Sequence, residues 1–196
     1  VDLKNKRDLP ITEAKLSPRG NKILYILNEI GKYRVYVHDL ATGKRDRLLK
    51  GGFRNAFQAT DYNYPHVAWS PNGQQVAIMY EKRDVVYLRI HDLTTGDYEQ
   101  EPLSTEYQRV FSMDFVNPIT LVFSAAVRGQ SDLFLYYTNT RQTQRITNDF
   151  WDDLDASYVE LGDQKGILFT SNRPDSMLER EKLDTTLPIG NFDIFY

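Results

Sequence analysis

The chain has 196 residues, a hydrophobic content of 41% and a formal net charge of −3, which suits one globular domain or a large piece of one and argues against nucleic acid as the main partner. The absence of cysteine excludes a disulfide framework and a cysteine-ligated zinc site. No apolar run is long enough to span a membrane. The first ten residues contain neither a signal peptide nor an initiator Met, so we expect a segment of a longer protein.

One pattern, a turn rich in Ser, Pro, Asn or Gly followed by an apolar and aromatic run, recurs along the chain. Proline presets the backbone for the first central position of a turn, and Gly or Asn accepts the positive φ that follows. The residues on either side are then expected to pair as antiparallel strands. The turns and their following runs occupy residues 17–21 with 22–27, 70–74 with 75–80, 116–118 with 119–123, and 161–166 with 167–170.

A second pattern follows the first in the first three copies. A strand-like run ends in a polar turn that begins at Asp39, Asp92 or Thr138, and Gly or Asn is suited to the left-handed position. These three turn residues lie 53 and 46 positions apart. Four-stranded propeller blades repeat at roughly this interval. The runs are short and rich in β-branched and aromatic residues, without helical spacing, which predicts an all-β fold.

The two patterns together predict a β-propeller of four-stranded antiparallel blades, and we expect a partial propeller of about four blades in a single domain, residues 1–196. Open blade edges leave backbone groups unpaired, so self-association is also expected. The repeats are predicted at about 13–50, 66–103, 110–147 and 155–196, with 1–10 as an outer strand of a preceding or closing blade and 175–184 as a short turn of helix. The predicted strands are 13–16, 22–28, 33–39, 45–49, 66–69, 75–81, 86–92, 97–102, 110–115, 119–125, 132–138, 142–147, 156–160, 166–171 and 192–196.

Residues 169–174, Phe-Thr-Ser-Asn-Arg-Pro, together with 193–196, Asp-Ile-Phe-Tyr, resemble the FSSNR…DIY signature of the TolB-type, WD-like propeller repeats. Residues 145–148 resemble the segment that closes a blade, and 68–73 resemble the family's Trp-Ser-Pro-Asp-Gly turn. The third and fourth repeats depart from the Ser-Pro turn, and residues 175–192 form an insertion within the fourth repeat.

The resemblance implies a non-enzymatic scaffold of the bacterial periplasm or cell envelope that binds a protein or peptide partner and needs no cofactor. One alternative is the gating propeller of a prolyl-oligopeptidase-type hydrolase. Its catalytic domain would lie outside this chain, which contains no Gly-x-Ser-x-Gly nucleophile motif. Another is a carbohydrate- or metal-dependent lyase built on a propeller.

Aromatic residues in two blade connections are the candidate partner-binding residues. Aromatic side chains on loops above a rigid scaffold suit partner binding. The connections, at residues 51–65 and 148–155, are expected on the same face of the propeller. The alternative is that the aromatic side chains fold back and cover the blade edges. The candidates are Phe53, Phe57, Tyr62, Tyr64, Phe150 and Trp151.

Histidine and acidic residues are assigned no catalytic or metal-binding role. His38 and His91 occupy equivalent positions before the Asp turns, and we interpret both as structural. His66 lies at the start of a strand, and nothing in the spacing brings it to the other two. Asp149, Asp152, Asp153 and Asp155 lack the pattern of a calcium-binding loop and are interpreted as a solvated acidic loop between blades.

Overall fold

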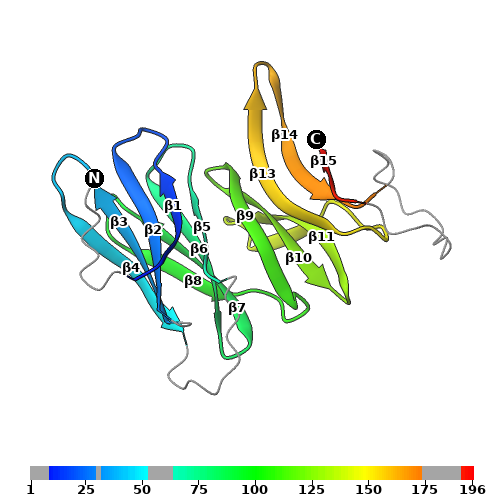
Figure 1. Ribbon diagram of the computed structural model, residues 1–196, viewed down its shortest axis with the longest axis horizontal. Coiled ribbons are helices and arrows are strands. Elements are labelled where there is room, and N and C mark those ends of the chain that lie inside the picture. Colours follow the sequence, from blue (N-terminus) through cyan, green and yellow to red (C-terminus); the bar gives the residue numbers. More distant parts are fainter. Residues whose placement is uncertain (1–8, 30–31, 53–63, 174–190) are drawn as a thin grey trace. The chain divides into compact units, whose positions relative to one another are not determined.

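The computed structural model describes residues 9–29, 32–52, 64–173 and 191–196 (Figure 1). The described residues form strands, turns and loops, with no helix among them. The chain divides into two compact units, residues 1–103 and 104–196. Each unit contains two antiparallel sheets, which we number blades 1 to 4 in chain order.

The first unit contains two four-stranded sheets in which each strand pairs with the next along the chain. Such an up-and-down meander is the form expected of a propeller blade. Blade 1 consists of β1 (Ile11–Leu16), β2 (Lys22–Glu29), β3 (Lys32–Asp39) and β4 (Arg45–Gly52). Blade 2 consists of β5 (His66–Trp69), β6 (Gln75–Lys82), β7 (Val85–Asp92) and β8 (Tyr98–Pro102).

The tight turns of the first unit form for the local reasons that the sequence indicates. Gly20, Gly43, Gly73 and Gly96 all have positive φ values between 67° and 83°, where a side chain would be strained. In the turn that leads into β6, the Ser70 hydroxyl accepts a hydrogen bond from the Gln75 amide at 2.8 Å. Hydrogen bonds of this kind, from a backbone amide to a turn side chain, close a hairpin and so help to set the strand register.

The core of the first unit lies between its two sheets. Both blades contribute fully buried side chains, among them Leu24 and Val35 from blade 1 and Val76 and Ile78 from blade 2. Backbone polar groups at the edges of this core are also satisfied across the sheets, since the Arg89 guanidinium donates to the Leu48 carbonyl oxygen at 3.3 Å. Blades 1 and 2 therefore share one apolar core, which fixes their mutual packing.

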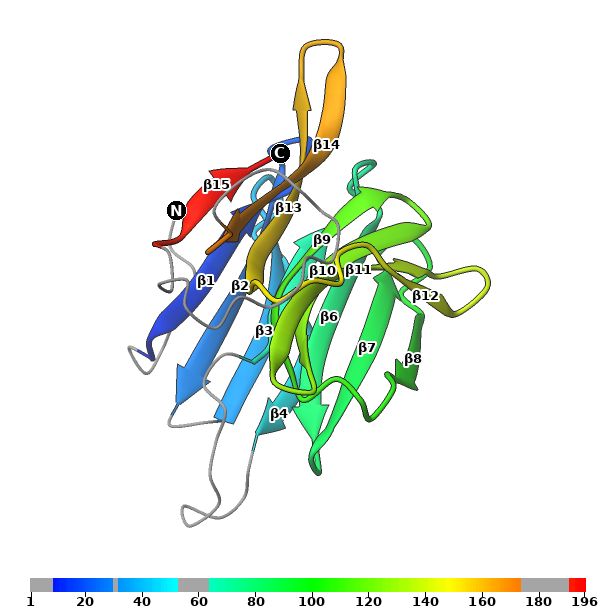
Figure 2. The same cartoon turned by 90° about the vertical axis from the view of Figure 1, so that its right-hand side faces the viewer.

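The second unit contains one four-stranded and one three-stranded sheet. Blade 3 consists of β9 (Arg109–Asn117), β10 (Thr120–Val127), β11 (Gln130–Tyr137) and β12 (Gln142–Arg145), and blade 4 of β13 (Asp153–Leu161), β14 (Gln164–Ser171) and β15 (Asp193–Phe195). β15 lies at the edge of blade 4 beside β14, as Figure 2 shows in red and orange. Val122, Leu133, Ala156 and Phe169 form the buried contact between the two sheets.

The structure confirms the all-β class and the meander of antiparallel strands. All fifteen predicted strands correspond to observed ones, and their ends differ by at most three residues. Two ends are shifted by three residues: β4 runs to Gly52 rather than to residue 49, and β13 begins at Asp153 rather than at residue 156. The reason at β13 is a bulge between Leu154 and Ser157, with Asp155 at a φ of 55°, which interrupts the alternating pattern. The strand predicted within residues 1–10 falls largely, and the helical turn at 175–184 entirely, outside the described residues.

Candidate functional site

The aromatic candidates differ in how much of each side chain the structure leaves accessible. Tyr64 is buried, with 4% of its surface exposed, and its ring meets the His66 ring edge-on at 5.4 Å. Phe150 and Trp151 are adjacent in the connection between β12 and β13, and both are partly exposed. The three remaining candidates, Phe53, Phe57 and Tyr62, lie outside the described residues.

The connection that carries Phe150 and Trp151 is held in place by hydrogen bonds to its backbone. Asp149 accepts the Trp151 amide on Oδ1 at 2.9 Å. The Asp152 amide donates to Oδ1 of Asn172 at 2.8 Å, and the Asp152 carboxylate accepts the Ser131 amide at 3.1 Å. The backbone on both sides of the Trp151 side chain is therefore anchored to blades 3 and 4.

A buried arginine lies beneath this connection. The Nη2 atom of Arg173 lies 2.6 Å from each carboxylate oxygen of Asp153 and 3.0 Å from Oδ2 of Asp149. All three side chains are almost completely buried. The contact of Nη2 with Asp149 is longer than its contacts with Asp153. Asp153 is consequently the stronger partner and Asp149 the weaker one.

A second arginine and carboxylate lie next to this pair. Arg145 forms a short ion pair with Asp132, which is fully buried on β11. Arg145 also donates from Nε to the Thr147 carbonyl oxygen at 2.9 Å, and the Thr147 hydroxyl accepts the Leu133 amide at 3.0 Å. The connection between β12 and β13, called the aromatic connection below, is therefore bonded to blade 3 at its start and to blade 4 at its end by the same cluster.

The cluster contains more negative than positive groups, because three carboxylates face two guanidinium groups. Burial raises the pKa of Asp132 to about 6, and Arg145 opposes this rise while Asp153 and Asp149 add to it. Burial also raises the pKa of Asp149, against the effects of the Trp151 amide and Arg173. Desolvation of a carboxylate favours its protonated form, so this cluster holds a proton more readily than exposed aspartates do.

The interpretation of the acidic residues as a solvated loop is wrong for Asp149 and Asp153. The two side chains are 3% and 0% exposed and pair with Arg173. A buried carboxylate needs a cation or several hydrogen-bond donors nearby, and Arg173 supplies the cation.

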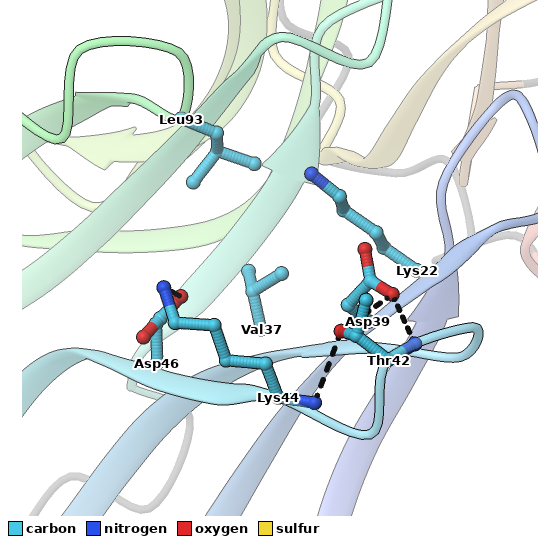
Figure 3. Close-up of a pocket in the computed structure, with 7 residues that line it drawn as sticks. All are labelled: Lys22, Val37, Asp39, Thr42, Lys44, Asp46 and Leu93. Atoms are coloured by element: carbon cyan, nitrogen blue, oxygen red, sulfur yellow. Dashed lines mark hydrogen bonds and ion pairs between the residues drawn. The ribbon is translucent and has the colours of Figure 1, made fainter.

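A polar pocket of about 260 Å³ lies in the first unit, at the end of blade 1 where the turn of blade 2 approaches (Figure 3). Val37 and Leu93 form its apolar part. The Lys44 ammonium is paired with Asp46 at 3.0 Å, and the Lys22 side chain extends toward the side where Leu93 lies. The remaining lining residues are Asp39 and Thr42.

The pocket's chemistry is that of a solvated turn. Oδ1 of Asp39 accepts the amide and the hydroxyl of Thr42 at 2.8 and 2.9 Å, which lowers the pKa of Asp39. Asp92 makes the same bonds to Thr94 in blade 2. Both aspartates are thus committed to hydrogen bonds within their own turns.

The two histidines that precede these turns are buried. His38 and His91 are 4% and 6% exposed, and His91 packs against the Tyr98 ring at 5.1 Å. Burial lowers the pKa of His91 to about 4, with Arg89 acting in the same direction and the Leu48 backbone opposing it. No group of three or more metal-ligating side chains occurs among the residues that the structure describes.

Known proteins resemble this chain in sequence and in fold, although no family model matches it. The Tol-Pal system protein TolB of Helicobacter hepaticus is 35% identical over 103 residues, which are 52% of this chain and 24% of that protein. TolB of Coxiella burnetii is 49% identical over 41 residues, 21% of this chain and 9% of that protein. This chain therefore matches a quarter or less of the length of each of these relatives.

Solved structures agree on the fold. TolB from Acinetobacter baumannii superposes with a TM-score of 0.59 and 14% identity, over 88% of this chain and 45% of that one. An acylaminoacyl peptidase superposes with a TM-score of 0.57 and 11% identity, over 96% of this chain and 32% of that one. The solved structures and the meander of antiparallel blades identify the fold as that of a β-propeller, and about half of the chain is similar in sequence to TolB of Helicobacter hepaticus.

Proposed function

We propose that this chain is a non-enzymatic, protein- or peptide-binding propeller of the bacterial cell envelope. The observation that carries the proposal is the 35% identity to a Tol-Pal system protein across about half of the chain. The relatives are named as members of a multi-protein system, and a propeller within such a system serves as a rigid binding scaffold. The periplasm is the compartment that this proposal implies.

The connection that carries Phe150 and Trp151 is the part of the described chain best suited to meet a partner. Its two aromatic side chains are partly exposed, and aromatic residues are enriched among the side chains that dominate binding energy. Its backbone is already anchored through Asp149 and Asp152, so little conformational entropy would be lost on binding. Anchoring of this kind favours a preformed binding surface.

Within the described ranges, no helix has the length and apolar character needed to cross a bilayer.

The gating propeller of a serine hydrolase is the second candidate function. The similarity in fold to an acylaminoacyl peptidase supports it, although 11% identity supports the fold alone. The two candidates differ in one measurable property. A gating propeller acts on peptides only through a catalytic domain in the same protein, whereas a scaffold binds its partner without one.

Isothermal titration calorimetry with the Pal protein of the same organism tests the proposal, because the relatives belong to the Tol-Pal system. We expect saturable binding to this chain. Trp151→Ala should weaken it by roughly tenfold or more, the usual effect of removing an aromatic anchor. Tyr98→Ala is the matched control, since Tyr98 is 53% exposed on β8 in the other unit.

Two outcomes would contradict the proposal in different ways. Absence of any binding to Pal would argue against the scaffold function. Binding that Trp151→Ala and Tyr98→Ala weaken equally would remove the aromatic connection from the binding surface. Circular dichroism of each variant establishes that the sheets are intact before the titrations are compared.

A further inference from the structure

Arg173 contacts two elements of the second unit that are far apart in sequence. On one side, its guanidinium pairs with Asp153 and Asp149 beneath the aromatic connection. On the other, the guanidinium carbon lies 5.4 Å from the centre of the Phe169 ring and 5.7 Å from that of the Phe195 ring. The buried arginine therefore links the carboxylates to an aromatic pair that includes the edge strand β15.

The contacts continue from Arg173 to the backbone of the aromatic connection. Asp149 faces Arg173 with Oδ2 and accepts the Trp151 amide on Oδ1 at 2.9 Å. Asn172, which precedes Arg173, accepts the Asp152 amide at 2.8 Å. A displacement of residues 172–173 would consequently loosen the backbone at two successive positions of the connection.

β15 is a short edge strand, and the rings of Phe195 and Tyr196 pack on β14 at Phe169 and Gly166. It forms only three residue pairs with β14, and Ile194 is 70% exposed. Phe195, by contrast, stacks on Phe169 with a distance of 5.8 Å between ring centres. A short edge strand with few residue pairs belongs to the parts of a fold that open most easily.

We propose that Arg173 couples the docking of β15 to the conformation of the Phe150–Trp151 connection. With Phe195 in place, its ring covers one face of the guanidinium and keeps water away from the ion pairs with Asp149 and Asp153. When β15 leaves, water reaches the guanidinium and weakens both attractions, because charges interact less strongly in a medium of higher dielectric constant. The weaker Asp149 contact yields first and releases the Trp151 amide.

This coupling goes beyond the proposed function, because it is a property of the fold with or without a partner. It also acts in both directions, as any coupling between two equilibria must. A molecule that binds the connection in its anchored form would strengthen the docking of β15. A molecule that pairs with β15 would in turn order the connection.

Hydrogen exchange at the Trp151 amide, followed by NMR, measures the coupling directly. Phe195→Ala should speed this exchange on the order of tenfold, because removal of the ring exposes the arginine and destabilises the bond from Trp151 to Asp149. Ile194→Ala is the matched control, as the neighbouring side chain points to solvent, and it should leave the exchange unchanged.

Trp151 fluorescence gives a second measurement in the Trp69→Phe background. The chain contains two tryptophans, so this change makes Trp151 the single indole. Phe195→Ala should shift its emission to longer wavelength and increase quenching by acrylamide, whereas Ile194→Ala should do neither. Neither measurement includes a partner, so failure of the coupling and failure of the partner-binding function are separate results.

Arg173→Lys tests the link itself and covers the case in which Phe195→Ala fails to fold. Lysine keeps the charge but cannot present a planar group to the carboxylates and the rings together. We expect Trp151 exchange to rise in this variant. The coupling is refuted if Trp151 exchange stays slow in Arg173→Lys, or if Phe195→Ala releases β15 without affecting Trp151.

Discussion

Trp69 and Lys15 connect the first two blades through a reciprocal pair of hydrogen bonds. The Trp69 indole donates to the Lys15 carbonyl oxygen at 3.1 Å, and the Lys15 ammonium donates to the carbonyl oxygen of Val67, two residues before Trp69, at 2.7 Å. Trp69 is only 8% exposed, so its indole N–H needs a partner within the protein. These bonds join β1 to β5 at the edge of the shared core.

Replacement of Trp69 by Phe should reduce the free energy of unfolding of the first unit by about 1 kcal/mol, because the Lys15 carbonyl loses its donor. Urea unfolding followed by circular dichroism measures the change. Trp151→Phe is the control, since Trp151 is partly exposed in the other unit. Equal losses in the two variants would show that the bond to Lys15 contributes nothing specific.

Much of the fold could be predicted because its signals are local. The turns at Asp39 and Asp92 depend on a side chain bonded to a backbone amide two or three residues later, which a sequence pattern records. The strand periodicity likewise depends only on neighbours along the chain. The meander followed from these turns, since each one returns the chain beside the strand that it has just left.

The Arg173 cluster could not be predicted for the opposite reason. Its partners Asp149 and Asp153 are 24 and 20 residues away, and their burial depends on how blades 3 and 4 pack. From sequence alone, four aspartates within seven residues resemble a solvated loop. The arrangement of Lys22 and Leu93 around one pocket was missed similarly, because they come from different blades.

The pKa of Asp39 should lie below its usual value of 3.8, mainly because the carboxylate accepts the Thr42 amide and hydroxyl. NMR titration of the side chain measures this directly. Thr42→Val removes the hydroxyl bond and should move the pKa of Asp39 back toward 3.8. Asp92, bonded to Thr94 in blade 2, is the internal control and should be unaffected. An unchanged Asp39 titration in Thr42→Val would exclude the hydroxyl as a cause.

His91 should make the first unit less stable in acid. Its folded pKa of about 4 lies below the usual 6.5, mainly because the ring is buried, so the unfolded chain binds a proton between these values and the folded chain does not. The free energy of unfolding of the first unit is therefore expected to decrease by up to about 3 kcal/mol as the pH falls from 6.5 toward 4.

Urea unfolding of the first unit between pH 7 and pH 4 tests this expectation. His91→Phe should flatten the acid dependence, because no imidazole remains to bind the proton. His66→Gln serves as the control, since His66 is less buried than His91. If His91→Phe keeps the full acid dependence of the parent chain, the loss of stability has another source.

Asp132 should make the second unit more stable in acid, whereas His91 makes the first unit less stable. Burial raises its folded pKa to about 6 from 3.8, so the folded chain binds a proton between these values and the unfolded chain does not. The contribution of this group to stability therefore increases as the pH falls from above 6 toward 4. Asp132→Asn, which carries no charge at any pH, should remove this gain.

The prediction is checked by following amide exchange at residues of β11 and β13 between pH 7 and pH 5, after correction for the intrinsic pH dependence of exchange. Asp163→Asn is the control, since Asp163 lies in the exposed turn between β13 and β14. Protection in the parent chain should grow relative to Asp132→Asn as the pH falls. A parallel course in the two chains would mean that Arg145 keeps Asp132 ionised, and that the excess charge of the cluster is neutralised at another carboxylate.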